Sequence, residues 1–275
     1  MSAKLVKDAY GKSAIRLVKV VREGAIHRIH DCTVAVSLEG RFESAHTEGN
    51  NTDVLPTDTM KNTVFALARD AALDEPERFA HLLGRHFLEA SAAADRATIE
   101  LMLHRWDRVG GYAFTRGAAE RRVAVVSATR DGVEIEAGIE GLGLLKTAGS
   151  GFEGFPRDRY TTLKETADRI FATDLSARWR YAGFPPSCDD AFDRVRTALV
   201  DCFVAHQSRS VQHTLYAMGE AALSACPELT EIDLTMPNRH HLLVDLSPFG
   251  LENPNEIFVA TTEPHGLIKG TIARK

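Results

Sequence analysis

The chain has 275 residues, of which 44% are hydrophobic and 26% are charged, which is enough apolar material for a sizeable core. A formal net charge of −5 gives no basic excess and argues against nucleic acid or an anionic membrane as a partner. No apolar run approaches the ~20 residues that a transmembrane helix needs. Residues 1–10 lack a signal-peptide core, and residues 272–275 do not read as a peroxisomal address. We therefore expect a cytoplasmic protein.

The four cysteines, Cys32, Cys188, Cys202 and Cys226, are widely spaced and form no CxxC pair. This spacing favours neither a zinc site nor a disulfide framework, and reduced thiols suit a cytosolic chain.

Alternation of apolar and polar residues with a period of two predicts strands. It is clearest at 133–140, where Val133, Ile135 and Ile139 alternate with polar residues or glycine. Shorter strands are predicted at 15–21, 31–38, 98–103, 122–127, 176–181, 231–236, 240–246 and 257–261.

Four other segments have apolar residues at helical spacing, which predicts helices that pack on a core. The sequence Asp74-Glu75-Pro76 suits the start of the second one. The four stripes are Met60, Val64, Leu67 and Ala71; Phe79, Leu83 and Phe87; Phe192, Val195, Leu199 and Phe203; and Val211, Leu215, Met218 and Ala222.

The order of these elements repeats. It runs strand, strand, helix, helix, strand, strand to about Ser127, and starts again near Gly132. This order predicts an α+β fold with two modules, residues 1–130 and 131–275, each an antiparallel sheet with helices on one face. The other face of each sheet would need a partner, so we expect an oligomer.

Residues 54–63 lead from a predicted loop into a predicted helix. Thr57 or Asp58 fits the N-cap of that helix. The same hydroxyl and amide groups at a helix start also suit an anion or a small polar ligand. The two interpretations are compatible, and both stay open on the sequence alone.

A turn-rich segment at residues 151–158 is followed by Arg169. Taken singly, Phe152 fits a core position and Arg169 fits a surface ion pair. Taken together, an aromatic ring and a planar guanidinium suit a flat, anionic heterocycle. The ring stacks on such a ligand, and the guanidinium donates two parallel hydrogen bonds to it.

Residues 236–241 lie at a predicted strand junction. Neighbouring residues on a strand point to opposite faces, so His240 and His241 should not chelate one metal ion. Because no Asp, Glu or Cys cluster completes a ligand set nearby, we expect no metal. Asn238 and His240 would share one strand face, where an amide and an imidazole can position water or oxygen and move protons.

Together these segments resemble the motifs of the uricase family. Residues 57–63, Thr-Asp-Thr-Met-Lys-Asn-Thr, resemble its threonine-bearing motif, and residues 237–241, Pro-Asn-Arg-His-His, resemble its third motif. Residues 10–12 and 210–212 are similar to two further family positions. The stretch 144–169 is similar to the long family signature through Leu144, Leu145, Lys146, Thr147, Phe152, Phe155, Tyr160, Leu163 and Arg169.

Two positions depart from the family pattern. Ala148 stands where a second hydroxyl residue is usual, and Glu153 stands where some members have an aromatic residue. Neither belongs to the expected site, so the departures bear on loop packing.

The resemblance implies a tandem T-fold with two β-β-α-α-β-β modules. Subunits would pair into a sixteen-stranded barrel, and two barrels would stack into a homotetramer around a tunnel, with active sites at the subunit interfaces. In such a site Arg169 and Gln212 would clamp urate, Phe152 would stack on it, and Leu163 would pack against the purine. The expected substrate-binding residues are Thr57, Asp58, Phe152, Leu163, Arg169, Val211, Gln212 and Asn238.

The resemblance also implies the chemistry. Lys12 and Thr57 of a neighbouring subunit would form a proton-handling dyad, with His240 in the proton relay. Urate would be oxidised by O2 and water to 5-hydroxyisourate and H2O2, without a cofactor, in purine catabolism toward allantoin.

Two alternatives remain. A different T-fold enzyme would act on a pterin or a related purine, usually through a glutamate anchor. A non-catalytic purine-binding or assembly protein would not need Lys12, Thr57 and His240.

Overall fold

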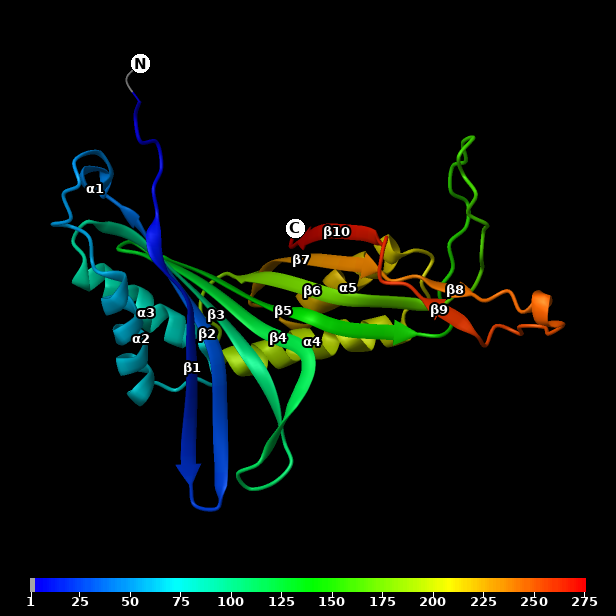
Figure 1. The fold of residues 1–275 in the computed structure, drawn as a ribbon, viewed down its shortest axis with the longest axis horizontal. Helices are drawn as coiled ribbons and strands as arrows, with labels where there is room; N and C mark the ends of the chain where they lie inside the picture. The colour runs from blue at the N-terminus through cyan, green and yellow to red at the C-terminus, as the bar shows by residue number, and fades with distance from the viewer. Residues whose placement is uncertain (1–2) are drawn as a thin grey trace. The chain divides into compact units, whose positions relative to one another are not determined.

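The first half of the chain forms long strands that lie side by side in chain order (Figure 1). The computed structural model describes residues 3–275. Neighbouring strands pair antiparallel from β1 to β4, so the turns between β1 and β2 and between β3 and β4 can be short. The strands are β1 (Tyr10–Glu23), β2 (Ile26–Gly40), β3 (Ala94–Arg108) and β4 (Phe114–Thr129).

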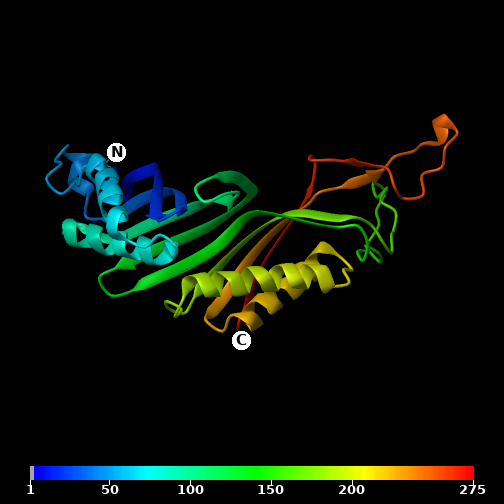
Figure 2. The same cartoon turned by 90° about the horizontal axis from the view of Figure 1, so that it is seen from below.

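Helices α2 (Thr57–Asp70) and α3 (Pro76–Ala90) cover one face of these strands, as Figure 2 shows, and α1 (Glu43–Thr47) is a single short turn before them. Of the first predicted helical stripe Met60 and Val64 are buried, with Ala68 in place of Leu67 and Ala71, and all of the second stripe is buried. Each fully buried Leu or Phe contributes about 1.5–3 kcal/mol by leaving water. The buried side chains include Val34, Val36, Leu38, Met60, Val64, Phe79, Leu83, Phe87, Ile99 and Val126.

The second half repeats the order. β5 (Val133–Lys146) and β6 (Phe171–Tyr181) precede α4 (Cys188–Ala205) and α5 (Val211–Ala225), and β7 (Leu229–Asn238) follows. The strand order is β5-β6-β7-β10, with β10 (Gly266–Ala273) closing the set. Helix α5 packs on β7 and β10. The prediction of an antiparallel α+β tandem T-fold with helices on one face is therefore confirmed.

Residue contacts divide the chain into two units. Unit 1 contains the described residues up to Gly138 together with Trp179–Phe192, and unit 2 contains Ile139–Arg178 and Asp193–Lys275. The chain thus passes between the units within β5, β6 and α4. The module boundaries proposed from the element order, 1–130 and 131–275, stay a prediction.

Two strand predictions near the C-terminus were wrong in extent. Of the predicted strand 240–246 only β8 (His241–Leu243) forms, and it pairs with β9 (Phe258–Ala260) in a separate ribbon, with a 3-10 turn at Ser247–Phe249 between them. β7 pairs on the side away from β6 with β10, a strand that the sequence did not predict. Glycines interrupt the alternation of apolar and polar residues in β10. Gly270 makes room for Leu215, because a Cβ there would lie 2.9 Å from the Leu215 side chain.

No helix in residues 3–275 is both long enough and apolar enough to cross a membrane.

Candidate active site

Lys12 lies on a distorted part of β1. The register between β1 and β2 shifts between Lys12 and Ile15, and Ala14 has a φ of 56°. A bulge of this kind redirects a side chain at the edge of a sheet. Gly11 permits it, because a Cβ there would lie 1.8 Å from the carbonyl oxygen of Val36. Lys12 itself is half-buried.

Tyr10 connects this part of β1 to the segment that starts α2. Its hydroxyl accepts a hydrogen bond of 2.9 Å from the backbone N–H of Leu55, and its ring packs edge-on against Phe42 at 4.8 Å. Burial raises the pKa of Tyr10. Tyr10 and Leu55 each lie two residues before a predicted site residue, Lys12 and Thr57 respectively, so this contact brings the two segments together.

The start of α2 is not capped by a side chain. The N-cap residue is Pro56, and no side-chain hydrogen bond caps the helix, so the N-cap interpretation of Thr57 and Asp58 was wrong. The half-buried Thr57 instead begins the helix. Because Pro56 supplies no capping side chain, the backbone N–H groups of this first turn suit a ligand.

Neighbouring side chains lower the pKa of Asp58. The hydrogen bond from Lys61 is the main cause of the lowered pKa of Asp58, with further contributions from the side-chain amide of Asn62 and the charge of Lys12. The Tyr10–Leu55 hydrogen bond therefore joins the segments of Lys12 and of Thr57 and Asp58 within unit 1.

A hollow of about 400 Å³ opens beside Lys12. It is lined by polar side chains of three neighbouring strands, namely Ser13, Ser37, Thr98 and Glu100. Lys12 thus borders space that water can occupy.

A second group of predicted residues gathers in unit 2. The backbone of Phe152 exchanges hydrogen bonds of 2.8 and 3.2 Å with Thr166, and its ring stacks on Phe155 at 4.9 Å. The guanidinium carbon of Arg169 lies 5.4 Å from the centre of the Phe152 ring. The predicted combination of an aromatic ring and a guanidinium is therefore present, although Phe152 is half-buried rather than enclosed in the core.

Arg169 is a half-buried cation. Burial lowers the pKa of Arg169, and no carboxylate contributes an opposing shift. A guanidinium still stays charged at neutral pH. Within residues 3–275 Arg169 is in no ion pair, so the alternative of a surface ion pair does not hold.

The start of α5 is attached to the Phe152 segment. The N–H of Ser208 donates to the carbonyl of Gly149, and the N–H of Gly151 donates to the carbonyl of Ser208, both at 2.9 Å. Two residues further, Ser210 caps α5 by accepting a hydrogen bond of 3.1 Å from the N–H of His213. Two predicted site residues lie at this helix start: Val211 is buried and Gln212 is exposed.

The ends of β6 and β7 complete this group. The N–H of Arg239 donates to the carbonyl of Ala172 at 2.9 Å in an antiparallel bridge, so the residues beside Arg239 lie next to the start of β6, which Arg169 precedes. Asn238 is the last residue of β7. His240 lies between β7 and β8 and not on a strand as predicted, and its carbonyl accepts from Thr261.

Leu163 belongs to neither of these two groups of predicted residues. It is 52% exposed, within the loop between β5 and β6 that extends from unit 2 in Figure 1.

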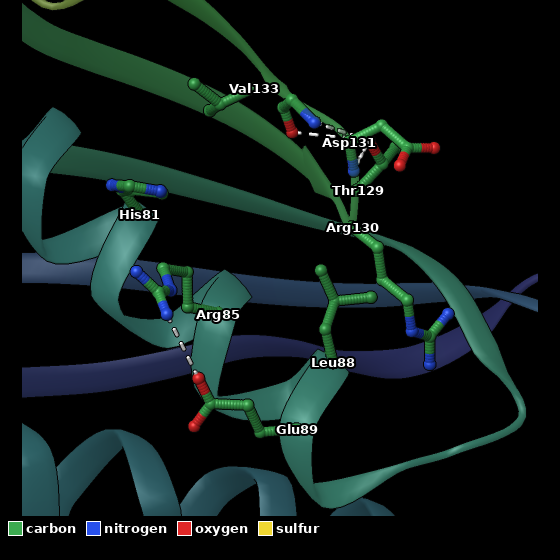
Figure 3. A pocket seen from close by; sticks show the side chains of 9 residues that line it. His81, Arg85, Leu88, Glu89, Thr129, Arg130, Asp131 and Val133 are labelled. Carbon is green, nitrogen blue, oxygen red and sulfur yellow. Dashed lines mark hydrogen bonds and ion pairs between the residues drawn. The ribbon is translucent and has the colours of Figure 1, made fainter.

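Another hollow, of about 630 Å³, lies between α3 and the turn from β4 to β5 (Figure 3). Arg85 and Glu89 lie on one helix face and are paired at 3.3 Å. None of the predicted site residues is among those that line it.

Two contacts near the site were not predicted from the sequence. Tyr10 belongs to a family-like motif, but its partner Leu55 carries no sequence signal. His206 and His213 lie 3.2 Å apart through ring nitrogens, and a spacing of seven residues across a loop does not predict such a contact.

A β-β-α-α-β-β order that occurs twice, with helices on one sheet face, defines a tandem T-fold protein. A family model described as Uricase matches residues 8–131 and 135–269. The chain belongs to the uricase family.

Individual uricases are similar to this chain over nearly its whole length. The uricase of Arthrobacter globiformis is 47% identical over 273 residues, which cover 98% of this chain and 90% of that protein. The uricase of Dictyostelium discoideum is 34% identical over 281 residues, with 99% and 98% covered. The crystal structure of the Arthrobacter globiformis uricase has a TM-score of 0.95 at 46% identity, covering 100% of this chain and 96% of that chain.

Proposed function

We propose that this protein is a urate oxidase that converts urate, O2 and water to 5-hydroxyisourate and H2O2 without a cofactor. The observation that carries the proposal is the half-buried Arg169 guanidinium, which pairs with no carboxylate of residues 3–275 and lies 5.4 Å from the centre of the Phe152 ring. This is the combination that a planar anion needs, because a buried cation favours an anionic partner and the ring offers a flat apolar surface.

In the proposed complex, Arg169 and Gln212 clamp one edge of urate while Phe152 stacks on its face. The backbones of Val211 and Asp58 donate or accept further hydrogen bonds. Support comes from the hydrogen bonds between residues 149–151 and Ser208, which hold the Phe152 segment against the start of α5.

Catalysis needs proton removal before oxidation. Doubly deprotonated urate is electron-rich and transfers an electron to O2 directly, so the protein has to bind, orient and deprotonate. In this proposal Lys12 takes the proton through Thr57, and Asn238 and His240 hold oxygen or water above the purine plane. As a base Lys12 must act as the neutral amine, and the Tyr10–Leu55 hydrogen bond, two residues from Lys12 and two from Thr57, supports the pairing of the two residues.

We further propose a homotetramer in which Lys12 and Thr57 of one subunit face Arg169 of a neighbour. Exposed apolar side chains support a further subunit contact, since single soluble chains seldom expose so many together. Those around the β8–β9 ribbon are Leu242, Leu243, Phe249, Leu251, Ile257 and Val259. Such a contact would also cover Leu163. A role in cytoplasmic purine catabolism completes the proposal.

Aerobic urate consumption by purified, chelator-treated protein, with H2O2 measured in parallel, tests the function. We expect urate loss with one equivalent of peroxide. A folded, oligomeric protein that leaves urate intact contradicts the proposal. Binding of a pterin by that protein would then favour the other T-fold enzymes, and binding of urate without turnover would favour a purine-binding protein.

A further inference from the structure

Two histidines meet where α5 begins. Nε2 of His206 lies 3.2 Å from Nδ1 of His213, and the ring centres are 4.3 Å apart with the planes at 62°. His206 follows the last residue of α4, and His213 is in the first turn of α5. The pair therefore closes a loop of residues 206–213 that contains Val211 and Gln212.

The neighbouring backbone settles which ring donates. The N–H of Arg209 also donates to Nδ1 of His213, at 3.4 Å. A backbone N–H only donates, so Nδ1 of His213 carries no proton, and Nε2 of His206 is the donor of the inter-ring bond.

The closed loop is attached to unit 2 on two sides. Lys146, the last residue of β5, donates to the carbonyl of His206 at 2.6 Å. Ser208 in the middle of the loop exchanges hydrogen bonds with Gly149 and Gly151. The loop therefore joins the end of β5, the Phe152 segment and the start of α5.

We propose that His206 and His213 are positioning residues that order the first turn of α5, and with it Gln212, before substrate arrives. The inference rests on the proposed function, in which Gln212 and the backbone of Val211 bind urate. Binding to a preordered turn avoids the entropy cost of ordering it at that moment.

Burial and the neighbouring positive charges keep His206 neutral at neutral pH. Burial is the first cause of the lowered pKa of His206, and the charges of His213 and Lys146 lower it further. Arg209 lies in the loop itself, and Cys202 on α4 and Asp168 act on Lys146.

Matched variants separate the hydrogen bond from simple packing. We expect His213→Ala and His206→Ala each to raise the KM for urate by about three- to tenfold with kcat within about twofold of wild type. His213→Asn retains an acceptor and His206→Gln retains a donor, so both should restore most of the affinity. An unchanged KM in the alanine variants overturns the proposal, as does equal loss in the alanine and the conservative variants.

A double variant and a control sharpen the test. His206→Ala/His213→Ala should be no weaker in urate affinity than either single variant, because each removes the same bond, whereas additive losses contradict a shared role. The control is His86→Ala on α3, in the other unit, which should leave the KM unchanged.

Hydrogen exchange tests the loop without any activity. In the ligand-free protein, amides of residues 207–213 should exchange faster in His213→Ala than in wild type or His213→Asn. Equal exchange overturns the inference. If wild type shows the slow exchange but does not oxidise urate, the proposed function fails and the ordering of the loop stands.

Discussion

The hydroxyl of Tyr10 accepts a hydrogen bond from the N–H of Leu55 at 2.9 Å, which joins β1 to the segment that starts α2. This single bond spans 45 residues of sequence and lies two residues from both Lys12 and Thr57. It holds the proposed dyad in register, independently of either dyad residue.

Tyr10→Phe should lower the free energy of unfolding by about 0.5–1.5 kcal/mol, because the half-buried N–H of Leu55 loses its acceptor while the ring still packs on Phe42. We expect kcat to fall several-fold and the KM for urate to change little. Denaturant unfolding and steady-state kinetics check this. Tyr216→Phe, at an exposed tyrosine of α5, is the control, and equal effects of the two substitutions would contradict the role of Tyr10.

Lys12→Met and Thr57→Ala should each lower kcat by about 100-fold or more, since general-base catalysis contributes about 10²–10⁴. The double variant should lose no more than the worse single variant, because the two residues act as a unit. Urate binding measured without O2 should persist. Lys269→Met, an exposed lysine of β10, is the control. Wild-type turnover in either dyad variant would remove that residue from the mechanism.

Arg169→Ala should weaken urate binding by about 100-fold, through the loss of charge-assisted hydrogen bonds. Arg169→Lys retains the charge without the planar guanidinium, so its affinity for urate should lie between those of Arg169→Ala and wild type. Anaerobic equilibrium dialysis with urate measures both. Arg85→Ala on α3 is the matched control, and an affinity unchanged in Arg169→Ala would argue that the anion binds elsewhere.

The buried pair of Glu77 and Arg122 predicts a pH dependence of stability. Glu77 is fully buried and accepts hydrogen bonds of 2.9 and 3.2 Å from Arg122. Burial raises the pKa of Glu77, and it outweighs the opposite effect of Arg122. Because the pKa of Glu77 is higher in the folded state, its titration contributes to the free energy of unfolding below the pKa of the unfolded chain, which is near 4.5. That contribution is lost as the pH rises through the pKa of the folded state.

Glu77→Gln has no titratable carboxyl group at this position. We therefore expect the free energy of unfolding of wild type to decline relative to that of Glu77→Gln as the pH rises from about 4 to about 7. Urea unfolding at a series of pH values measures the difference. Glu89→Gln, at an exposed site on the same helix, should show no such trend. A relative gain by wild type over this range would mean that Arg122 outweighs burial.

Local patterns determined much of this protein. Apolar spacing of two or of three to four residues predicted all the long helices and the strands from β1 to β7, because one face of each element must leave water. Phe152 and Arg169 pointed to a site for a planar anion, the residues around Thr57 to an anion or a small polar ligand, and Asn238 with His240 to bound water or oxygen. Local patterns failed at β10, where glycines make room for Leu215, and at His240, which lies off the strand.

The tertiary structure decided which of these residues meet. The contacts of Tyr10 with Leu55, of Gly151 with Ser208 and of Ala172 with Arg239 each join residues more than 40 positions apart. No local propensity specifies such pairs, because they depend on how strands and loops pack once the core has formed. For the same reason, the pairing of His206 with His213 and the burial of Arg169 without a carboxylate emerged only from the folded chain.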